Sequence, residues 1–570
     1  MSGAHRFSGS GARDAAGRFS RARAIALSIA AAAVLLSSCN AKKEKTPAPV
    51  AQKAIPSIAK KDGRYALMVD GAPYLVLGAQ MNNWSNYPAV LPKVWPVVEK
   101  LGANTLFAPV AWEQTEPQEG RFDFSYVDML IAQARQHKVR LVLLWFGTWK
   151  NTSPSYAPAW VKLNNGRFPR MIDPKGNKSY SLSPLYQSTL DADRKAFVTL
   201  MTHLKAVDPQ RTVIMMQVEN EPGTYRCVRD YGPAGQKLFD GPVPDRLAAG
   251  MHKMPGTWKQ VFGKDADEYF HAWYVASFIE QVAAAGHAVY PLPMYTNAAL
   301  RDPLKPQDPS TYASGGPTWN VIDIYKIAAP TLSVEAPDIY ARAYPVFMAH
   351  LKFYHRPDNP LFVPEIGNDQ PFARYFFAIL GNQGIGFTPF GMDFTGYNNY
   401  PLGAKTVDDE EIAPFAANFR LIAPMAREWA KLSFESKVWG SSEPDDHKAQ
   451  TIALGRWAAK ISYRQAPFWF TRDVSLIKSD SPYAKLPPRG GVVIAQLEPG
   501  EFLITGAYAR VEFGMADPKS NLHVQYDRVE EGRYENGKWV FHHVWNGDQT
   551  DWGLNFTSRL QVLRVKLATY

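Results

Sequence analysis

Between Tyr65 and about Leu432, short apolar runs alternate with stretches in which apolar residues recur at helical spacing. Val127, Leu130, Ile131 and Ala134 are one example of the helical spacing. The runs are continuously apolar, which is typical of strands buried on both faces of a parallel sheet. The eight candidate strands are Leu75–Gln80, Ala103–Ala111, Val139–Gly147, Thr212–Val218, Val289–Thr296, Thr331–Glu335, Leu361–Glu365 and Ile385–Phe390.

Eight strands that alternate with helices predict an α/β fold of the (β/α)8 TIM-barrel type over residues 62–432. The periodicity does not reveal whether the sheet closes on itself. A doubly wound open sheet is therefore the alternative.

After about Leu432 the pattern changes to β-rich sequence. An Asn-Gly pair inside Tyr534–Trp539 predicts a tight hairpin turn. Residues 433–570 are therefore expected to form a β-sandwich-like accessory domain. Its candidate strands are Thr451–Tyr463, Gly491–Gln496, Glu501–Phe513 and Asn521–Arg528.

The first 38 residues have the pattern of an export signal. An uncharged apolar run, Ala24–Ser38, follows three arginines and ends at Cys39. The run of 15 residues is too short to span a bilayer comfortably. Leu36-Ser-Ser-Cys39 resembles the bacterial lipobox, in which the Cys is lipidated and becomes the first mature residue. An ordinary signal peptide with an incidental Cys is the alternative.

Residues 39–61, rich in Pro, Ala and Lys, then predict a lipidated tether. Asn40 follows Cys39, whereas Asp is the usual inner-membrane retention residue. The resemblance therefore implies a lipoprotein of the outer membrane, facing the periplasm, that contacts the membrane only through its lipid anchor.

The formal charge of +10 comes almost entirely from these two segments. Residues 1–38 carry a net charge of +4 and residues 39–61 carry +5, so residues 62–570 are left with +1. This distribution argues against a nucleic acid partner. A nearly neutral body with 16 Trp, 27 Tyr and 30 Phe suits an uncharged ligand such as a sugar.

The sequence predicts neither a metal nor a cofactor. Cys39 and Cys227 are the only cysteines, too few for a zinc cluster, and the 12 His show no ligand spacing. The glycines of residues 381–386 have the wrong spacing for a dinucleotide-binding loop.

Catalytic residues of such barrels lie at the C-terminal ends of the strands. The fourth candidate strand leads into Glu219-Asn220-Glu221, and the seventh ends at Glu365. Two carboxylates that face one opening are the apparatus that cleaves a glycosidic bond. Strand alternation alone does not choose between Glu219 and Glu221.

Three motifs resemble those of glycoside hydrolase family 35, with family 42 as the nearest relative. They are Gln217-Val-Glu-Asn-Glu221-Pro-Gly, the segment from Asn104 through Trp112-Glu-Gln-Thr-Glu116-Pro to Phe124, and Leu77-Gly-Ala-Gln-Met-Asn-Asn. Both families are chiefly β-galactosidases. The resemblance covers about residues 65–430. Members of family 42 often carry a zinc-binding Cys cluster, and this sequence has none, which favours family 35. The C-terminal domain resembles that of a bacterial branch that includes enzymes acting on galactosylated xyloglucan.

The resemblance implies that Glu221 is the acid/base and Glu365 the nucleophile, and that Asn220 binds the sugar 2-OH. Tyr340 is a candidate to hold the nucleophile's oxygen. One departure concerns strand three, where many family members place a Glu that binds galactose. Here Trp149-Lys-Asn151 stands instead, so Asn151 is the candidate replacement and Trp149 a candidate stacking platform. The other candidate stacking residues are Trp84, Trp112, Trp160 and Trp319.

The resulting hypothesis is a retaining exo-β-galactosidase without cofactor that acts on plant-wall oligosaccharides. An endo-acting or other exo-acting glycosidase of the same clan is an alternative within enzymes. A glycan-binding surface lipoprotein without catalysis is the alternative of another class. The sequence does not predict the oligomeric state.

Overall fold

The computed structural model describes residues 53–463 and 487–570. The predicted signal peptide, the lipidation site Cys39 and most of the tether lie outside these residues. Within the described ranges, no helix is both long enough and apolar enough to cross a membrane.

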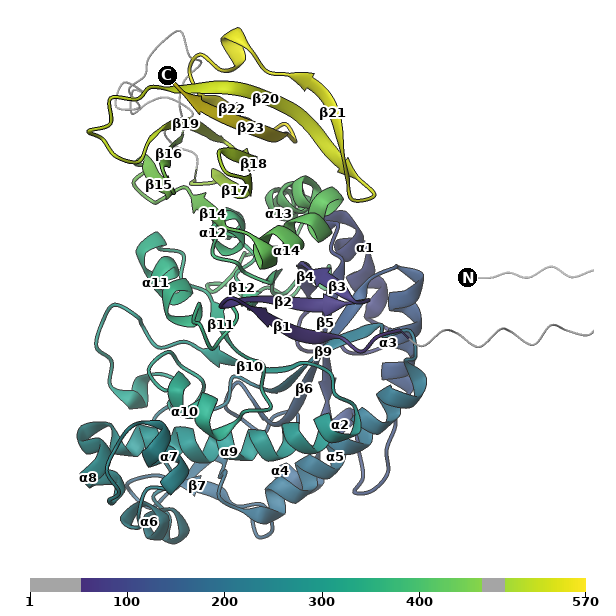
Figure 1. The fold of residues 1–570 in the computed structure, drawn as a ribbon. Coiled ribbons are helices and arrows are strands. Elements are labelled where there is room, and N and C mark those ends of the chain that lie inside the picture. Colours follow the sequence, from purple (N-terminus) through teal and green to yellow (C-terminus); the bar gives the residue numbers. More distant parts are fainter. Residues whose placement is uncertain (1–52, 464–486) are drawn as a thin grey trace, which may run out of the picture. The chain divides into compact units, whose positions relative to one another are not determined.

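Eight parallel strands form a closed barrel in which chain neighbours are also spatial neighbours (Figure 1). The ring closes where β13 pairs with β4, and Gly386 lies opposite Val76. The TIM-barrel prediction is confirmed, and the open-sheet alternative is wrong. The barrel strands are β4 (Val76–Gln80), β5 (Thr105–Ala111), β6 (Arg140–Lys150), β9 (Val213–Asn220), β10 (Met294–Ala299), β11 (Val334–Ile339), β12 (Val363–Ile366) and β13 (Gly386–Pro389).

Helices surround the barrel and connect its strands. The principal ones are α1 (Leu91–Leu101), α3 (Ser125–Gln136), α5 (Gln187–Val207), α9 (Ala266–Val289), α10 (Ile322–Ala328), α11 (Tyr344–Tyr354), α12 (Tyr375–Gly381) and α13 (Asp409–Ile422). Shorter elements in the connecting segments are α2 (Trp112–Thr115), α4 (Ala159–Lys162), β7 (Arg170–Ile172), β8 (Lys178–Leu182), α6 (Pro233–Asp240), α7 (Asp245–Gly250) and α8 (Trp258–Phe262).

Apolar side chains fill the inside of the barrel. Phe362, directly before β12, contacts both Phe107 of β5 and Tyr295 of β10. These strands are not neighbours in the sheet, so their rings meet only inside the barrel. Along β6, Val142 and Leu144 belong to the same inner cluster. The intervening leucines pack with the helices outside, which explains the continuous apolar runs of the sequence.

A small antiparallel sheet covers the N-terminal end of the barrel. It consists of β1 (Ser57–Lys61), β2 (Arg64–Val69) and β3 (Ala72–Tyr74). Leu67 and Val69 of β2 join the apolar cluster inside the barrel. The segment expected to be tether therefore ends in a strand of the folded body, because Ser57–Lys61 pairs with β2.

The C-terminal residues form two antiparallel sheets, one of six strands and one of four. Helix α14 (Ala426–Glu435) precedes them. The larger sheet contains β14 (Val438–Ser442), β17 (Gly491–Glu498), β18 (Glu501–Ala507), β23 (Val562–Thr569), β20 (Val524–Glu535) and β21 (Lys538–Val544). The smaller sheet contains β15 (Gln450–Leu454), β16 (Trp457–Tyr463), β19 (Ala509–Met515) and β22 (Leu554–Phe556). The predicted hairpin at Asn536-Gly537 joins β20 to β21.

Two predicted strands of this region are each two strands in the structure. Thr451–Tyr463 folds back after Leu454 as the β15–β16 hairpin, where Gly455 has a φ of 75°. Glu501–Phe513 passes from the larger sheet to the smaller one at Tyr508, whose φ is 52°. Tyr is not a typical turn residue, so no residue type signals the second break.

The larger sheet packs on the barrel with one face and on the smaller sheet with the other. Val493 and Ala495 of β17 join the apolar cluster of the barrel helices. Val492 and Ile494 join the core between the two sheets. The backbones of α12 and β14 approach so closely that a Cβ added at Gly381 would lie 2.0 Å from the Gly440 nitrogen.

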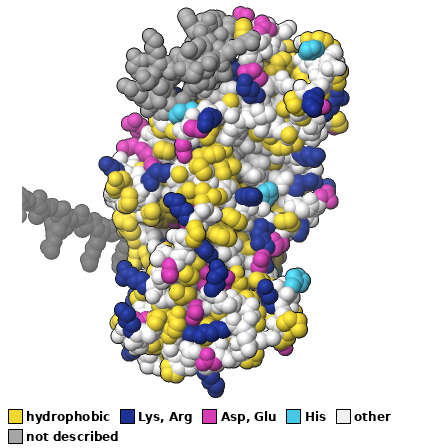
Figure 2. Space-filling view, turned by 90° about the vertical axis from the view of Figure 1, so that its left-hand side faces the viewer, with side chains coloured by type: hydrophobic (Ala, Val, Ile, Leu, Met, Phe, Trp, Pro, Cys, Tyr) yellow, Lys and Arg dark blue, Asp and Glu magenta, His cyan; other side chains and the backbone are white. Residues whose placement is uncertain are grey.

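Charges of both signs are interspersed on the surface of the described residues that Figure 2 shows. Lys and Arg side chains there alternate with Asp and Glu and do not merge into one basic area. This pattern agrees with the net charge of +1 for residues 62–570.

Candidate active site

A cavity of about 580 Å³ lies at the C-terminal ends of the barrel strands. Lys150, Asp338 and Glu365 at strand ends form part of its wall. Loops that follow the strands supply Asn151, Tyr225, Asp302 and Tyr397, and helix α11 supplies Val346 and His350. The cavity therefore lies at the end of the barrel where the sequence predicts the active site.

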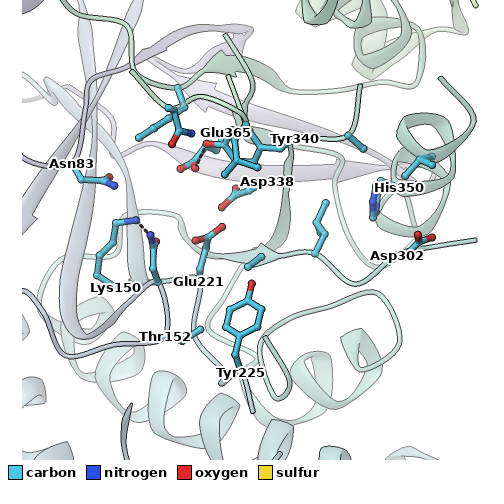
Figure 3. A pocket seen from close by; sticks show the side chains of 18 of the residues that line it. Asn83, Lys150, Thr152, Glu221, Tyr225, Asp302, Asp338, Tyr340, His350 and Glu365 are labelled. Carbon is cyan, nitrogen blue, oxygen red and sulfur yellow. Dashed lines mark hydrogen bonds between the residues drawn. The ribbon is translucent and has the colours of Figure 1, made fainter. Parts of the chain in front are cut away.

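Three carboxylates converge inside the cavity. One carboxylate oxygen each of Glu221, Asp338 and Glu365 lies within 4.8 Å of those of the other two. They follow or end the barrel strands β9, β11 and β12. Figure 3 shows all three side chains pointing toward one another. The structure thus brings together the two glutamates chosen from the sequence and adds a third acid.

Two hydrogen bonds hold the carboxylate of Glu365. The Gln80 amide donates to Oε2 at 2.7 Å, and the Tyr340 hydroxyl donates to Oε1. Each oxygen therefore has a fixed donor, which defines the orientation of the carboxylate. The expected contact between Tyr340 and Glu365 is present.

Glu221 and Asp338 are connected through Asn297 of β10. The Glu221 backbone N–H donates to Asn297 Oδ1 at 2.9 Å, and Asn297 Nδ2 donates to Asp338 Oδ2 at 2.5 Å. Burial and the negative charge of Glu365 raise the pKa of Glu221 to about 7. Burial, together with the charges of Glu365 and Glu221, also raises the pKa of Asp338 well above its usual value.

Lys150 brings a positive charge to the site. Its side chain is 5% exposed, and its Nζ donates a hydrogen bond to Asn151 Oδ1 (Figure 3). Its charge opposes the rise in the pKa of both Glu221 and Asp338. Asn151 lines the cavity, as expected, and its backbone N–H donates to the Asn220 carbonyl at 3.1 Å.

Local backbone geometry separates Glu219 from Glu221. Both have left-handed backbone angles, with φ of 63° and 44°, so the regular alternation of the strand is broken here. Glu219 is fully buried and accepts the backbone N–H groups of Trp149 and Thr148 at 2.6 and 3.2 Å. Glu221 lines the cavity. Only Glu221 is therefore placed to meet a ligand.

Trp149 is a correction to the sequence analysis. Its side chain is 1% exposed, does not line the cavity, and packs edge-on against Phe278 of α9. Its indole N–H donates to Ser181 Oγ at 3.1 Å. The Trp149 ring is thus part of the core and unavailable for stacking on a sugar.

The other four candidate stacking residues, Trp84, Trp112, Trp160 and Trp319, do not line the cavity either. Asn220 is also absent from its wall. Trp112 is fully buried and donates to Glu116 at 2.8 Å, whereas Trp84 is 39% exposed and contacts Tyr397 of the cavity wall edge-on. The Asn220 amide is fully buried, and neither of its polar atoms has a hydrogen-bond partner among the described residues.

Sequence reasoning missed Gln80, Lys150, Asn297 and Asp338 as site residues. All four are polar residues at or near the C-terminal end of an otherwise apolar barrel strand. Inspection of the polar residues at the ends of all eight strands would have found them.

The three carboxylates are close enough to ligate one cation. Much of their capacity is used within the protein, because both oxygens of Glu365 and Oδ2 of Asp338 accept hydrogen bonds from side chains. The raised pKa values of Glu221 and Asp338 favour a proton at these positions.

Comparison with known families bears on this site. Residues 81–273 match the model of glycoside hydrolase family 42, described as Beta-galactosidase. The match includes Glu221 but ends before Asp338, Tyr340 and Glu365. Residues 415–557 match a domain of unknown function, DUF5597.

The family match corrects the choice between the two resembled families. The matched model is that of family 42, and the match gives no support to family 35. The argument for family 35 was the missing Cys cluster. No Cys is among the residues that line the cavity, so the lack of such a cluster says little about this site.

Two curated relatives are similar to part of the chain. The beta-galactosidase of Xanthomonas manihotis is 26% identical over 223 residues, which cover 34% of this chain and 35% of that protein. Beta-galactosidase BgaA of Clostridium cellulovorans is 28% identical over 139 residues, covering 24% of this chain and 20% of that protein. The chain thus matches about a third or less of the length of these relatives.

Solved beta-galactosidase structures also align with the chain. The one from Bacillus circulans sp. alkalophilus has a TM-score of 0.42 and 13% identity, covering 64% of this chain and 61% of that chain. The one from the psychrophilic Marinomonas ef1 has a TM-score of 0.45 and 11% identity, covering 63% and 61%.

Proposed function

We propose that the protein is a retaining exo-β-galactosidase that removes terminal β-galactosyl residues from plant-wall oligosaccharides such as xyloglucan side chains. The observation that carries the proposal is the pair Glu221 and Glu365 inside the cavity, with an oxygen of each within 4.8 Å of the other. Retaining enzymes place their two carboxyl groups about 5–5.5 Å apart, and inverting enzymes about 6.5–9.5 Å apart. The spacing here favours the retaining mechanism.

In the first step, Glu365 attacks the anomeric carbon while protonated Glu221 donates its proton to the departing oxygen. The hydrogen bonds from Tyr340 and Gln80 orient the Glu365 carboxylate for the attack. With a pKa of about 7, Glu221 holds its proton in neutral and mildly acidic solution. The C–O bond to the leaving group breaks as the ester bond to Glu365 forms.

In the second step, Glu221 takes a proton from water, which attacks the ester and releases the sugar with retained configuration. Formation of the ester removes the negative charge of Glu365, which is one of the causes of the raised pKa of Glu221. The pKa of Glu221 therefore falls at the stage where it must act as a base.

The cavity volume supports a small substrate. About 580 Å³ lies within the range of about 300–1,000 Å³ that is typical of pockets for small ligands. The nearly neutral body of residues 62–570 favours an uncharged saccharide. We therefore place the natural substrate among neutral galactosylated oligosaccharides.

The decisive variants are Glu365→Ala and Glu221→Ala, assayed on an aryl β-galactoside with and without azide. Glu365→Ala should lose turnover, and azide should restore it with an α-galactosyl azide product, because azide replaces the missing nucleophile. Glu221→Ala should instead give a β-galactosyl azide, because azide attacks the intermediate. Unimpaired hydrolysis by Glu365→Ala would refute the assignment.

Initial rates on a galactosylated xyloglucan oligosaccharide, lactose and an aryl β-galactoside test the substrate class, with matched β-glucosides as controls. We expect all three galactosides to exceed their glucoside controls, and the xyloglucan oligosaccharide to exceed lactose. Release of oligosaccharides instead of galactose would identify an endo-acting enzyme and contradict the proposal.

We further propose that the chain is exported and anchored to the outer membrane, facing the periplasm, by a lipid on Cys39. The apolar run Ala24–Ser38 followed by this Cys supports the proposal. Expressed in a bacterial host with labelled palmitate, the full chain should carry the label in the membrane fraction, and Cys39→Ser should not. An unlabelled wild-type chain would contradict the anchor.

A further inference from the structure

The cavity extends to two sides of the three carboxylates. In Figure 3, Asn83 and Lys150 lie on one side, and Asp302 and His350 lie on the other. A glycosidic bond cleaved between Glu221 and Glu365 has its glycosyl unit on one side and its leaving group on the other. Asn151, the residue assigned to the galactosyl unit, adjoins Lys150.

The side that contains Asp302 and His350 is here called the distal arm. It is built by the end of β10 and the loop after it, by the segment before α11, and by α11 itself, which carries Val346 and His350. Its apolar wall is formed by Ala299, Leu300, Ala341 and Val346, and its polar groups are Asp302, Gln307 and His350. A mainly apolar wall with a few directed polar groups is typical of a binding site for a small ligand.

His350 is the most distinctive group of the distal arm. The residue is 3% exposed, and its Nδ1 is buried without a hydrogen-bond partner in the part of the chain that the structure describes. The ring lines the cavity, so the other nitrogen, Nε2, is the one that can meet a ligand. Burial lowers the pKa of His350 to about 4, so the ring is neutral at pH 7. Nε2 has no hydrogen bond to the described residues either, so a ligand hydroxyl group can pair with it in the cavity.

Asp302 adds a fixed negative charge to the same arm. Its Oδ1 accepts the backbone N–H groups of Leu304 and Lys305 at 2.8 and 3.0 Å, which orients the carboxylate. Oδ2 makes no hydrogen bond in the described part of the chain, and no Lys or Arg there forms an ion pair with Asp302. An acidic ligand would be repelled here, whereas a hydroxyl group can donate to Oδ2.

We propose that the distal arm binds the leaving-group sugar of the substrate, that this sugar is neutral, and that His350 and Asp302 select it by hydrogen bonds to its hydroxyl groups. The inference rests on the proposed galactosidase function and names its leaving-group specificity. A hydroxyl group both donates and accepts, so it suits either tautomer of a neutral imidazole. A uronic acid in this position would face Asp302 without a counter-charge.

The test compares kcat/KM for lactose and a galactosylated xyloglucan oligosaccharide with kcat/KM for a nitrophenyl β-galactoside, whose leaving group has no sugar hydroxyls. His350→Ala should lower the saccharide-to-aryl ratio by about 3- to 10-fold, the size expected for one neutral hydrogen bond. His350→Gln, which keeps a polar group in reach, should recover most of that ratio. His355→Ala, near the end of the same helix but outside the cavity wall, should leave the ratio as in the wild type.

Asp302→Asn tests the charge. Against a matched pair of galactosides whose leaving groups are glucose and glucuronate, the wild type should prefer glucose, and Asp302→Asn should reduce that preference by about 3-fold or more. An equal loss on saccharide and aryl substrates in His350→Ala, or no loss on either, would overturn the assignment of the arm.

A wild type that hydrolyses no galactoside would instead refute the proposed function. In that case, the affinity for the galactose-free xyloglucan oligosaccharide, measured by calorimetry, tests the sugar site in the distal arm independently of catalysis. Weaker binding to His350→Ala than to His355→Ala would support a sugar site. Equal binding would overturn it.

Discussion

At the scale of single residues, Glu221 is the group whose ionisation controls the proposed reaction. Burial and the Glu365 charge raise its pKa to about 7, and the Lys150 charge opposes the rise. The acid form is required for the first step, so kcat/KM should be highest below this pKa and fall as the pH rises through about 7. A pH profile of kcat/KM on a galactoside with a poor leaving group measures this decrease, which is the basic limb of the profile.

Lys150→Ala should move the same limb to higher pH, because it removes the charge that lowers the pKa of Glu221. A leaving group that needs no proton, such as a dinitrophenolate, should show no such limb. A limb that stays in place in Lys150→Ala, or that persists with dinitrophenolate, would mean that another group controls the profile.

Strand ends in the sequence pointed to Glu365 and to one of Glu219 and Glu221. The family resemblance chose Glu221 and suggested Tyr340 and Asn151 as further contacts, and all four chosen residues line the cavity. The sequence prediction failed at Trp149 for a physical reason. Only Lys150 and Asn151 of this segment face the cavity, and the indole turns toward α9. At the end of a strand the side chains no longer alternate regularly between its two faces. The direction of each side chain then depends on backbone angles that the residue types do not reveal.

At the scale of elements, the buried Glu219 joins the ends of β9 and β6. It accepts two backbone N–H groups of β6 and lies beside Asp193 of α5, which binds Trp145 Nε1 at 2.8 Å. Burial and the neighbouring Asp193 raise the pKa of Glu219 well above its usual value. Glu219 therefore holds the segment that carries Lys150 and Asn151 and is not itself in contact with the cavity.

Glu219→Gln should keep this arrangement, because a glutamine is similar to a protonated glutamate and can donate to Asp193. Glu219→Ala removes the acceptor of the Trp149 N–H and should lower the free energy of unfolding by about 1–3 kcal/mol. Urea unfolding of both variants measures the difference. Glu221→Gln is the opposite control, since it should lose activity by about 10²–10⁴-fold and keep its stability. Equal destabilisation by Gln and Ala at position 219 would contradict this role.

The strands of the two parts show which elements can be predicted from sequence patterns. All eight barrel strands were predicted, because strands covered on both faces leave long apolar runs. The break between β18 and β19 was not predicted, because Tyr508, a residue type that favours strands, lies at the break. Closure of the ring through β13 and β4 joins strands that are about 300 residues apart, which no local pattern reports.

At the scale of the whole molecule, the C-terminal sheets are packed tightly against the barrel. A Cβ at Gly381 would meet the Gly440 backbone at 2.0 Å, and Arg374 of the barrel reaches Asp445 at 2.7 Å. Helix α12, at the centre of this contact, follows β12, the strand that carries Glu365. The two parts are therefore expected to unfold together.

Gly381→Ala should lower the free energy of unfolding by about 1–3 kcal/mol, as expected for overpacking between two rigid backbones. Gly514→Ala on β19 is a matched control, because a Cβ there has nothing within 4 Å, and it should change stability by less than about 0.5 kcal/mol. Thermal unfolding of both variants tests the contact. A Gly381→Ala variant as stable as Gly514→Ala would show that the interface is looser than the structure indicates.

The central claim is that Glu365 and Glu221 hydrolyse a β-galactoside by two successive displacements. The most direct test follows hydrolysis of an aryl β-galactoside by the wild-type protein with proton NMR and records which anomer of galactose is formed first. The account predicts β-galactose first, which then mutarotates slowly to the equilibrium mixture. Initial release of α-galactose would show a single displacement and contradict the account.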